Sequence, residues 1–309
     1  MIQTFESLVE MLKVFPDEQS CIDHLTSVRW RDGAFCPYCG GRTVYHFKDG
    51  RNHKCGDCRK RFSIKVGTIF EDTHIPLHKW YIAIYLLTSH KKGISSVQLG
   101  KDIDVTQKTA WFMNHRLREA ARTKSFNAPL KNTVEVDETY IGGKERNKHA
   151  NKRTPGTQGR NTLTKSVALA LVERGGDVRA FHVQDVKSHT LQRFVVQHVA
   201  LGARVMTDEN RSYSGLAVFY KHGTVNHSSG VYVTGDVHSN TVEGFFSLFK
   251  RGIIGIYHHV SAKHLWRYLN ESSFRYNLRA EPNGEGFASL MSNCGGRLTY
   301  KALIAHEAE

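Results

Sequence analysis

The chain has 309 residues, 40% of them hydrophobic and 23% charged, which allows two or three folded domains and excludes a wholly disordered protein. Its 43 Lys and Arg residues against 29 Asp and Glu residues leave a net charge of +14. Basic side chains gain affinity by releasing the counterions condensed on phosphates, so this excess predicts a nucleic-acid partner. Solubility alone and an anionic membrane surface are the alternatives, and no basic amphipathic segment supports the membrane.

Residues 1–30 are predicted to be helical. Phe5, Leu8, Val9 and Leu12 recur at the spacing of an amphipathic helix. This segment lacks the basic start and the unbroken apolar run of a secretory signal. No apolar run in the C-terminal half approaches the roughly 20 residues that span a bilayer. The sequence therefore predicts a cytoplasmic protein with no membrane partner.

Residues 31–70 contain two CxxC pairs, which predict a zinc ribbon. Two thiolates three positions apart fit a tight turn, and two such turns complete the closed tetrahedral site of structural Zn²⁺. The ligands are Cys36, Cys39, Cys55 and Cys58. The stretch between the pairs reads as a hairpin with an Asp49-Gly50 turn. A redox dithiol is the competing use of CxxC, but the second pair argues against it.

Cations surround the predicted ribbon, which makes it a candidate contact for DNA or, alternatively, a solvated rim. They are Lys48, Arg51, Lys54, Arg59, Lys60 and Arg61. The two remaining cysteines, Cys21 and Cys294, are expected to be inert buried thiols.

Residues 71–128 are predicted to hold a helix-turn-helix. An apolar helix from Trp80 to Thr88 precedes a short helix ending near Ile103, and Thr106 can cap a second helix from Gln107 to about Ala121. The second helix carries polar side chains suited to bases and phosphates. The candidate DNA-binding residues there are Lys108, Thr109, Asn114, Arg116 and Arg118. An ordinary helical subdomain is the alternative.

Residues 129–280 change to strands and helices in the order of a ribonuclease-H-like α/β domain. Strands are predicted at 133–140, 166–172, 178–183 and 204–208, with a crossover helix from about Ser188 to Ala200. A short helix, another strand and a helix from Asn240 to Lys250 follow. The basic tract 144–160 reads as a flexible loop. Residues 281–309 are predicted to form a C-terminal tail.

Three acids occupy places that converge in such a layout: Asp137 in the first strand, Asp208 at the end of the fourth, and Glu243 on the later helix. Like charges this close repel unless cations bind between them. Carboxylate oxygens favour Mg²⁺ or Mn²⁺, and two such ions suit a phosphoryl transfer. The three acids are therefore the candidate catalytic residues and metal ligands.

Each acid has a structural alternative. Asp is disfavoured in the apolar strand around Asp137, so a functional role is expected there, whereas Asp208 could cap the following helix. Asn240, one turn before Glu243, could take the metal instead. The other carboxylates, Glu138, Glu209 and Glu271, rank lower. On the helix of Glu243, Lys250 and Arg251 are further DNA-binding candidates.

Several blocks of the chain, in one order, resemble the bacterial insertion-sequence transposases with an N-terminal zinc ribbon and an ISXO-like DDE domain, relatives of the Merlin elements. They include CPYCGG, VEVDETYIGGK, MTDENRSY and HSNTVEGFFSLFK. The resemblance covers nearly the whole chain, and the paired CxxC and VEVDETYIGGK are its specific parts.

The resemblance implies a divalent-metal DNA transposase. Such an enzyme binds the terminal inverted repeats of its element, nicks the 3′ ends and joins them to target DNA, with Asp137, Asp208 and Glu243 as its acids. It implies double-stranded DNA as partner, a homo-oligomer on paired ends, and a bacterial protein associated with the nucleoid. Overall we expect an α+β multidomain protein. A DNA-binding regulator with a non-catalytic C-terminal half and a ribonuclease-H-like nuclease are the rival interpretations.

Overall fold

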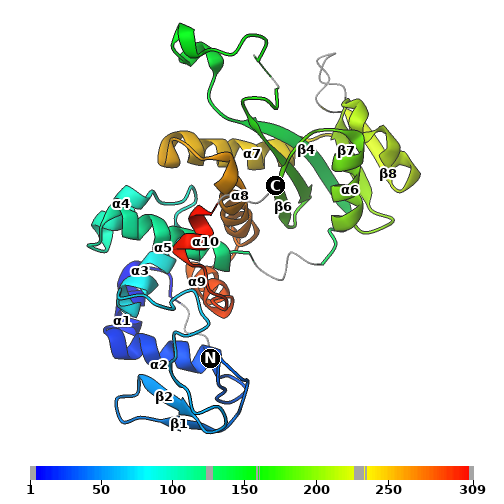
Figure 1. Ribbon diagram of the computed structural model, residues 1–309. Coiled ribbons are helices and arrows are strands. Elements are labelled where there is room, and N and C mark those ends of the chain that lie inside the picture. The colour runs from blue at the N-terminus through cyan, green and yellow to red at the C-terminus, as the bar shows by residue number, and fades with distance from the viewer. Residues whose placement is uncertain are drawn as a thin grey trace. The chain divides into compact units, whose positions relative to one another are not determined.

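The computed structural model describes residues 5–122, 128–157, 159, 161–225, 233 and 235–305. They form two compact units, one made of Met1–Arg122 with Ala280–Glu309 and the other of Thr123–Arg279 (Figure 1). None of the described helices is both long and apolar enough to cross a membrane.

The first unit begins with helices α1 (Leu8–Val14) and α2 (Glu18–Arg29). A capping box at Asp17 and Ser20 starts α2, since each residue binds the other's backbone N–H. Three more helices follow the ribbon, α3 (Leu77–Ser89), α4 (Ser96–Asp102) and α5 (Gln107–Ala120). The hydroxyl of Thr106 accepts from the Thr109 N–H, so the predicted cap of α5 is confirmed.

The ribbon is an antiparallel sheet of β1 (Val44–His46), β2 (Asn52–Cys55) and β3 (Arg61–Ser63), in that order. The hairpin predicted between the CxxC pairs is confirmed as β1 and β2. Its turn has Gly50 at φ +63°, a conformation that favours glycine, and Asp49 Oδ1 accepts from the Arg51 and Asn52 N–H groups at 3.0 Å. The third strand, β3, lies outside that prediction.

Residues 281–305, the described part of the segment predicted as a tail, hold helices instead. They contain α9 (Asn283–Ser292) and α10 (Tyr300–Ile304). Phe287 on α9 is buried, with its ring 5.1 Å from that of Phe5 and 5.3 Å from that of Tyr81. The sequence hid this because α9 completes a core whose other aromatic rings lie about 200 to 280 residues earlier in the chain.

The second unit is built on a five-stranded sheet of order β6-β5-β4-β7-β8. Its strands are β4 (Thr133–Ile141), β5 (Ser166–Glu173), β6 (Val178–Val183), β7 (Arg204–Asp208) and β8 (Lys221–Val225). The first three pair antiparallel, whereas β7 runs parallel to β4 and β8 parallel to β7. The four strands predicted with bounds are present, each within one residue of its predicted ends.

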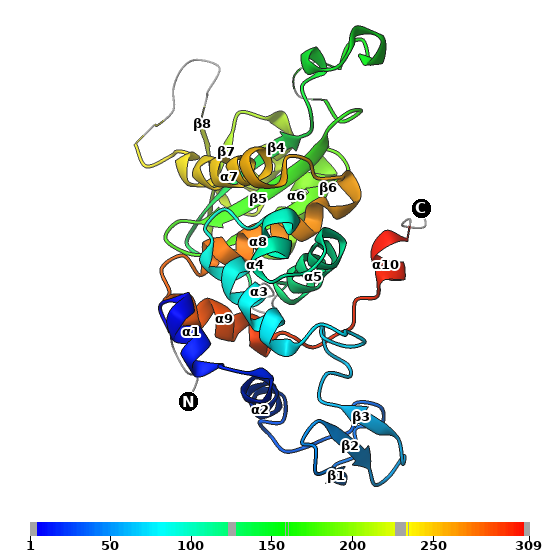
Figure 2. The ribbon, with the colours of Figure 1, turned by 90° about the vertical axis from the view of Figure 1, so that its left-hand side faces the viewer.

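Helices cover both faces of this sheet, as Figures 1 and 2 show. On one face, α6 (Ser188–His198) and the 3₁₀ turn η4 (Arg211–Val218) pack on Val134, Val136 and Val205. On the other, α7 (Asn240–Gly252) and α8 (Ala262–Asn277), joined by the π-helical turn η6 (Ile253–Tyr257), cover Ala168, Ala170 and Val172. Alternate residues of β5 thus enter two different cores, since Val167, Leu169 and Leu171 belong to the first.

The basic tract after β4 was predicted as a flexible loop. In its described part it holds two short 3₁₀ turns, η2 (Glu145–Asn147) and η3 (Ala150–Lys152). The buried Glu145 organises them, because its carboxylate accepts from Lys148 Nζ and from the Thr154 N–H at 3.1 Å.

Candidate active site and zinc centre

The four ribbon cysteines form a cluster suited to one metal ion. Their sulfurs all lie within 4.8 Å of one another, with Cys36 Sγ 3.7 Å from Cys58 Sγ and Cys39 Sγ 3.6 Å from Cys55 Sγ. Four sulfurs about 2.3 Å from a tetrahedral zinc ion lie roughly 3.8 Å apart. Backbone N–H groups also point at two of them, from Tyr38 to Cys36 and from Cys58 to Cys55, both at 3.4 Å. The spacing therefore fits Zn²⁺.

The parallel strands β4 and β7 of the second unit bring two of the acids, Asp137 and Asp208, side by side. In the parallel pair β4 and β7, Glu135 lies opposite Met206, and two residues further along each strand are Asp137 and Asp208. Parallel strands present their carboxyl ends at the same edge. Glu243 lies in the first turn of α7, the helix that packs on β4 and β5.

The electrostatics of Asp137 show that these acids sense one another. Its half-buried carboxyl has a pKa raised to about 7, first by burial and then by the negative charges of Glu138, Asp208 and Glu243. Its Oδ1 accepts from the Glu138 N–H at 2.8 Å, which lowers the pKa but does not offset the other effects.

Two of the three lower-ranked carboxylates, Glu138 and Glu271, have other partners. Glu138 points to the opposite face of β4, where Tyr213 Oη donates to it at 2.6 Å and Asn210 Nδ2 at 2.9 Å. Burial and the nearby Glu138 raise the pKa of Tyr213 well above its usual value, so its hydroxyl stays a proton donor. Glu271 accepts from Tyr257 Oη at 2.8 Å and pairs with Arg275. Both carboxylates serve the packing of the unit.

Glu135 is a residue that the sequence reasoning missed. It is fully buried on β4, two positions before Asp137, and its carboxylate receives the first backbone N–H groups of α7. The available signal was a second acid in the apolar strand, on the same face as Asp137.

The predicted DNA-binding residues of α5 divide into two groups. Asn114, Arg116 and Arg118 are buried. Arg116 donates to the carbonyls of Leu298, Ile69 and Glu71 at 3.1, 2.8 and 2.7 Å, which ties α5 to the rest of its unit. Burial does not support these three residues as DNA contacts. The sequence could not show this, because a polar helix face has the same pattern whether it meets solvent or backbone carbonyls. Lys108 is exposed and Thr109 half-buried near the start of α5, so both stay predictions.

Lys250 and Arg251 are exposed on α7, about two turns after Glu243. Spacings of seven and eight residues bring them to the same side of the helix as Glu243. Arg251 Nη2 donates to Ser247 Oγ at 2.9 Å, which holds the guanidinium along that side. Positive charge therefore flanks the predicted acids.

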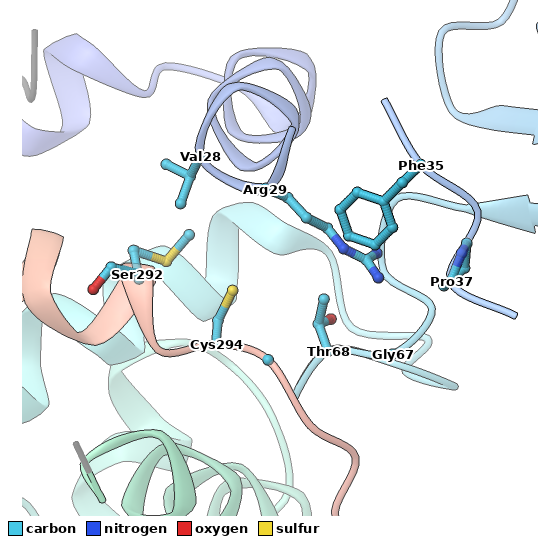
Figure 3. A pocket seen from close by; sticks show the side chains of 10 residues that line it. Val28, Arg29, Phe35, Pro37, Gly67, Thr68, Ser292 and Cys294 are labelled. Atoms are coloured by element: carbon cyan, nitrogen blue, oxygen red, sulfur yellow. The ribbon is translucent and has the colours of Figure 1, made fainter. Parts of the chain in front are cut away.

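A pocket of about 390 Å³ opens in the first unit, and it contains none of the predicted site residues. Arg29 reaches into it beside Phe35, facing Thr68 (Figure 3). The guanidinium donates to the Ile64 carbonyl and lies 5.5 Å from the centre of the Phe35 ring. Burial lowers the pKa of Arg29. These contacts join the end of α2 to the ribbon.

Comparison with known proteins assigns the chain to a family. The model of the ISXO2-like transposase domain matches residues 129–277, and that of the transposase zinc-ribbon domain matches residues 16–61. A protein in transposable element ISH50 of Halobacterium salinarum is 31% identical over 295 residues, covering 91% of this chain and 98% of its own length. The chain belongs to the ISXO2-like transposase family. It is accordingly a DDE transposase of an insertion sequence.

The matched regions of this ISXO2-like transposase contain the residues described above. Asp137, Asp208 and Glu243 lie in the DDE transposase match, and all four cysteines lie in the zinc-ribbon match. Among solved structures, the Mos1 strand transfer complex is 12% identical, covers 71% of this chain and 79% of that chain, and gives a TM-score of 0.23. A pre-cleavage Mos1 transpososome is 11% identical, covers 70% and 79%, and gives 0.20.

Proposed function

We propose that this ISXO2-like transposase binds double-stranded DNA at the terminal inverted repeats of its element, cleaves the 3′ ends and joins them to target DNA. The observation that carries the proposal is the parallel pairing of β4 with β7, which places Asp137 beside Asp208. The negative charges of Glu138, Asp208 and Glu243 also act on the Asp137 carboxyl, and with burial they raise its pKa. A buried carboxyl beside other carboxylates is a place where bound cations offset the repulsion.

The catalytic unit is, in this proposal, a ribonuclease-H-like domain. Numbered from β4, its strands lie in the order 3-2-1-4-5, with three antiparallel strands followed by two parallel ones. This strand order supports a ribonuclease-H-like domain, because it places β4 beside β7. The packing of α7 on β4 adds the helix that carries the third acid.

The donor set suits Mg²⁺ or Mn²⁺, which Asp137, Asp208 and Glu243 would hold through carboxylate oxygens. Such ions, when bound, activate the attacking oxygen and stabilise the leaving oxygen of a phosphoryl transfer. Glu243 rather than Asn240 is the third ligand in this proposal, because its charge acts on Asp137 and the Ser239 hydroxyl orients its Oε1 from 3.1 Å. The cysteine cluster would hold structural Zn²⁺.

For DNA we propose three contact regions. On α7, Lys250 and Arg251 flank the acids, and on α5, Lys108 and Thr109 lie where a helix-turn-helix would meet a groove. On the ribbon, Tyr45, Lys54 and Arg61 are paired across β1, β2 and β3, so they line one face of the sheet. Such chains would act as a homo-oligomer on paired ends.

The test incubates the zinc-loaded protein and Mg²⁺ or Mn²⁺ with labelled element ends and a target plasmid. We expect joined products, and we expect Asp137→Asn to lose cleavage and joining by about 10³-fold or more while it still binds the ends. Glu271→Gln, which alters a buried carboxylate on α8, is the matched control and should keep activity. Cleavage without joining would support the rival nuclease. End binding without either reaction would support the rival regulator, and undiminished joining by Asp137→Asn would refute the site.

A further inference from the structure

The carboxylate of Glu135 closes the N-terminus of α7. The first turn of a helix leaves backbone N–H groups without helical partners, and a preceding side chain usually accepts from them. Ser239, which precedes α7, makes no such bond. Instead Glu135 Oε2 accepts from the Thr241 N–H at 2.7 Å and the Val242 N–H at 3.0 Å, while Oε1 accepts from Thr241 Oγ1 at 2.9 Å. A carboxylate there also meets the positive end of the helix dipole.

Arg174 extends this contact to the segment before the helix. Its Nε donates to Glu135 Oε1 at 2.6 Å, and its two terminal nitrogens donate to the carbonyls of Asp236 at 2.8 Å and His238 at 3.0 Å. His238 Nδ1 lies 3.1 Å from the same Oε1. One buried carboxylate therefore fixes both the approach to α7 and its first turn.

These contacts connect the elements that carry two of the predicted acids. Glu135 lies two residues before Asp137 on the same face of β4, and Thr241 lies two residues before Glu243 on α7. A fully buried carboxylate is costly unless it is paired and hydrogen-bonded, and here both oxygens are. Among the described residues, no contact of Glu135 directs its carboxylate toward solvent or toward the space between the acids.

We propose that Glu135 is a positioning residue of the active site: its carboxylate holds the first turn of α7 so that Glu243 stays in register with Asp137, and it does not itself bind metal. This inference rests on the proposed function, since it assumes that Asp137 and Glu243 share a divalent cation. Groups that orient metal ligands typically change metal affinity or activity by about 10- to 100-fold when altered.

The test measures Mn²⁺ affinity calorimetrically and amide hydrogen exchange in zinc-loaded protein, without DNA. For Glu135→Gln we expect the Thr241 and Val242 amides to exchange about tenfold faster or more, and Mn²⁺ affinity to fall about tenfold. Glu271→Gln is the control for loss of a buried carboxylate that pairs with an arginine, and its Mn²⁺ affinity should stay within about twofold of the parent protein. Arg174→Gln changes a half-buried partner of Glu135 and serves as the test should Glu135→Gln fail to fold. It should also speed amide exchange at Thr241 and Val242 and lower the Mn²⁺ affinity, by smaller factors.

Unchanged exchange at Thr241 and Val242, or an unchanged Mn²⁺ affinity in Glu135→Gln, would overturn the inference. Asp137→Asn separates this failure from failure of the proposed site. If Asp137→Asn loses Mn²⁺ binding and Glu135→Gln does not, the positioning role alone is wrong. If Asp137→Asn keeps Mn²⁺ binding, the metal site is wrong and the positioning role falls with it.

Discussion

The Thr241 N–H lies 2.7 Å from Glu135 Oε2, although the two residues are 106 positions apart in the chain. This bond is one of three from the first turn of α7 to Glu135, and together they join the strand of Asp137 to the helix of Glu243. The candidate site of this transposase thus depends on a buried polar contact beneath the acids as well as on the acids themselves.

Removing a cysteine ligand should remove the zinc. Cys36→Ser is expected to bring bound zinc from about one per chain to near zero and to unfold the ribbon, because four protein ligands close a structural site. Metal analysis of the purified protein measures this. Cys294→Ala, which changes a buried thiol outside the cluster, should retain its zinc. Equal zinc in Cys36→Ser and the parent protein would refute the ligand set.

Stabilisation by Mg²⁺ should grow with pH around neutrality. The folded-state pKa of Asp137 is raised from 3.8 to about 7. The protonated carboxyl therefore contributes in full to the stability of the metal-free protein below pH 3.8, and this contribution is lost as pH rises through about 7. Metal binding needs the ionised form, so apparent affinity should fall roughly tenfold for each pH unit below 7.

Thermal unfolding with and without Mg²⁺ measures this difference. The rise in Tm on adding Mg²⁺ should be small near about pH 5.5 and large near about pH 8, since ligand stabilisation follows affinity. In Asp137→Asn the rise should be small at both. A rise in the parent protein that is equal at the two pH values would contradict the shifted pKa.

Arg116 should prove structural. Replacing it with Met leaves three buried carbonyls without their charged donor, so we expect a loss of about 3 kcal/mol in the free energy of unfolding. Lys108→Ala, at an exposed position of the same helix, should change it by less than about 0.5 kcal/mol. Denaturant titration measures the free energy of unfolding of both variants. An unchanged value for Arg116→Met would restore the interpretation of Arg116 as a surface residue of α5.

Lys250 and Arg251 should contribute to DNA affinity through phosphates. The double change to Ala is expected to weaken binding to all sequences alike and to reduce the slope of log K against log salt by up to about 1.8, near 0.9 for each phosphate that is no longer neutralised. Lys221→Ala, where β8 begins at the opposite end of the parallel strands, is the matched control. An unchanged salt slope in the double variant would exclude these two as phosphate contacts.

Phe287 should behave as a core residue of the first unit. Phe287→Ala removes a ring packed between Phe5 and Tyr81, and typical cavities of this kind cost about 3–5 kcal/mol. Thermal unfolding is the measurement, with Tyr300→Ala, a half-exposed aromatic on α10, as comparison. Equal Tm values for Phe287→Ala and the parent protein would mean that α9 is dispensable.

The sequence by itself determined the local features. The zinc cluster followed from two CxxC spacings, the cap of α5 from Thr106, and four strands of the sheet from alternating or continuous apolar residues. Each of these features depends on residues only a few positions apart. Strand context also singled out Asp137 for the same reason.

Only the tertiary structure decided which polar groups are buried and what they bind. Glu135 caps a helix 106 residues away, and Arg116 binds the carbonyl of Leu298, 182 residues away. Phe287 likewise fills a core begun by Phe5. Periodicity cannot tell whether a polar side chain meets water or a distant backbone, because that depends on which segments the fold brings together.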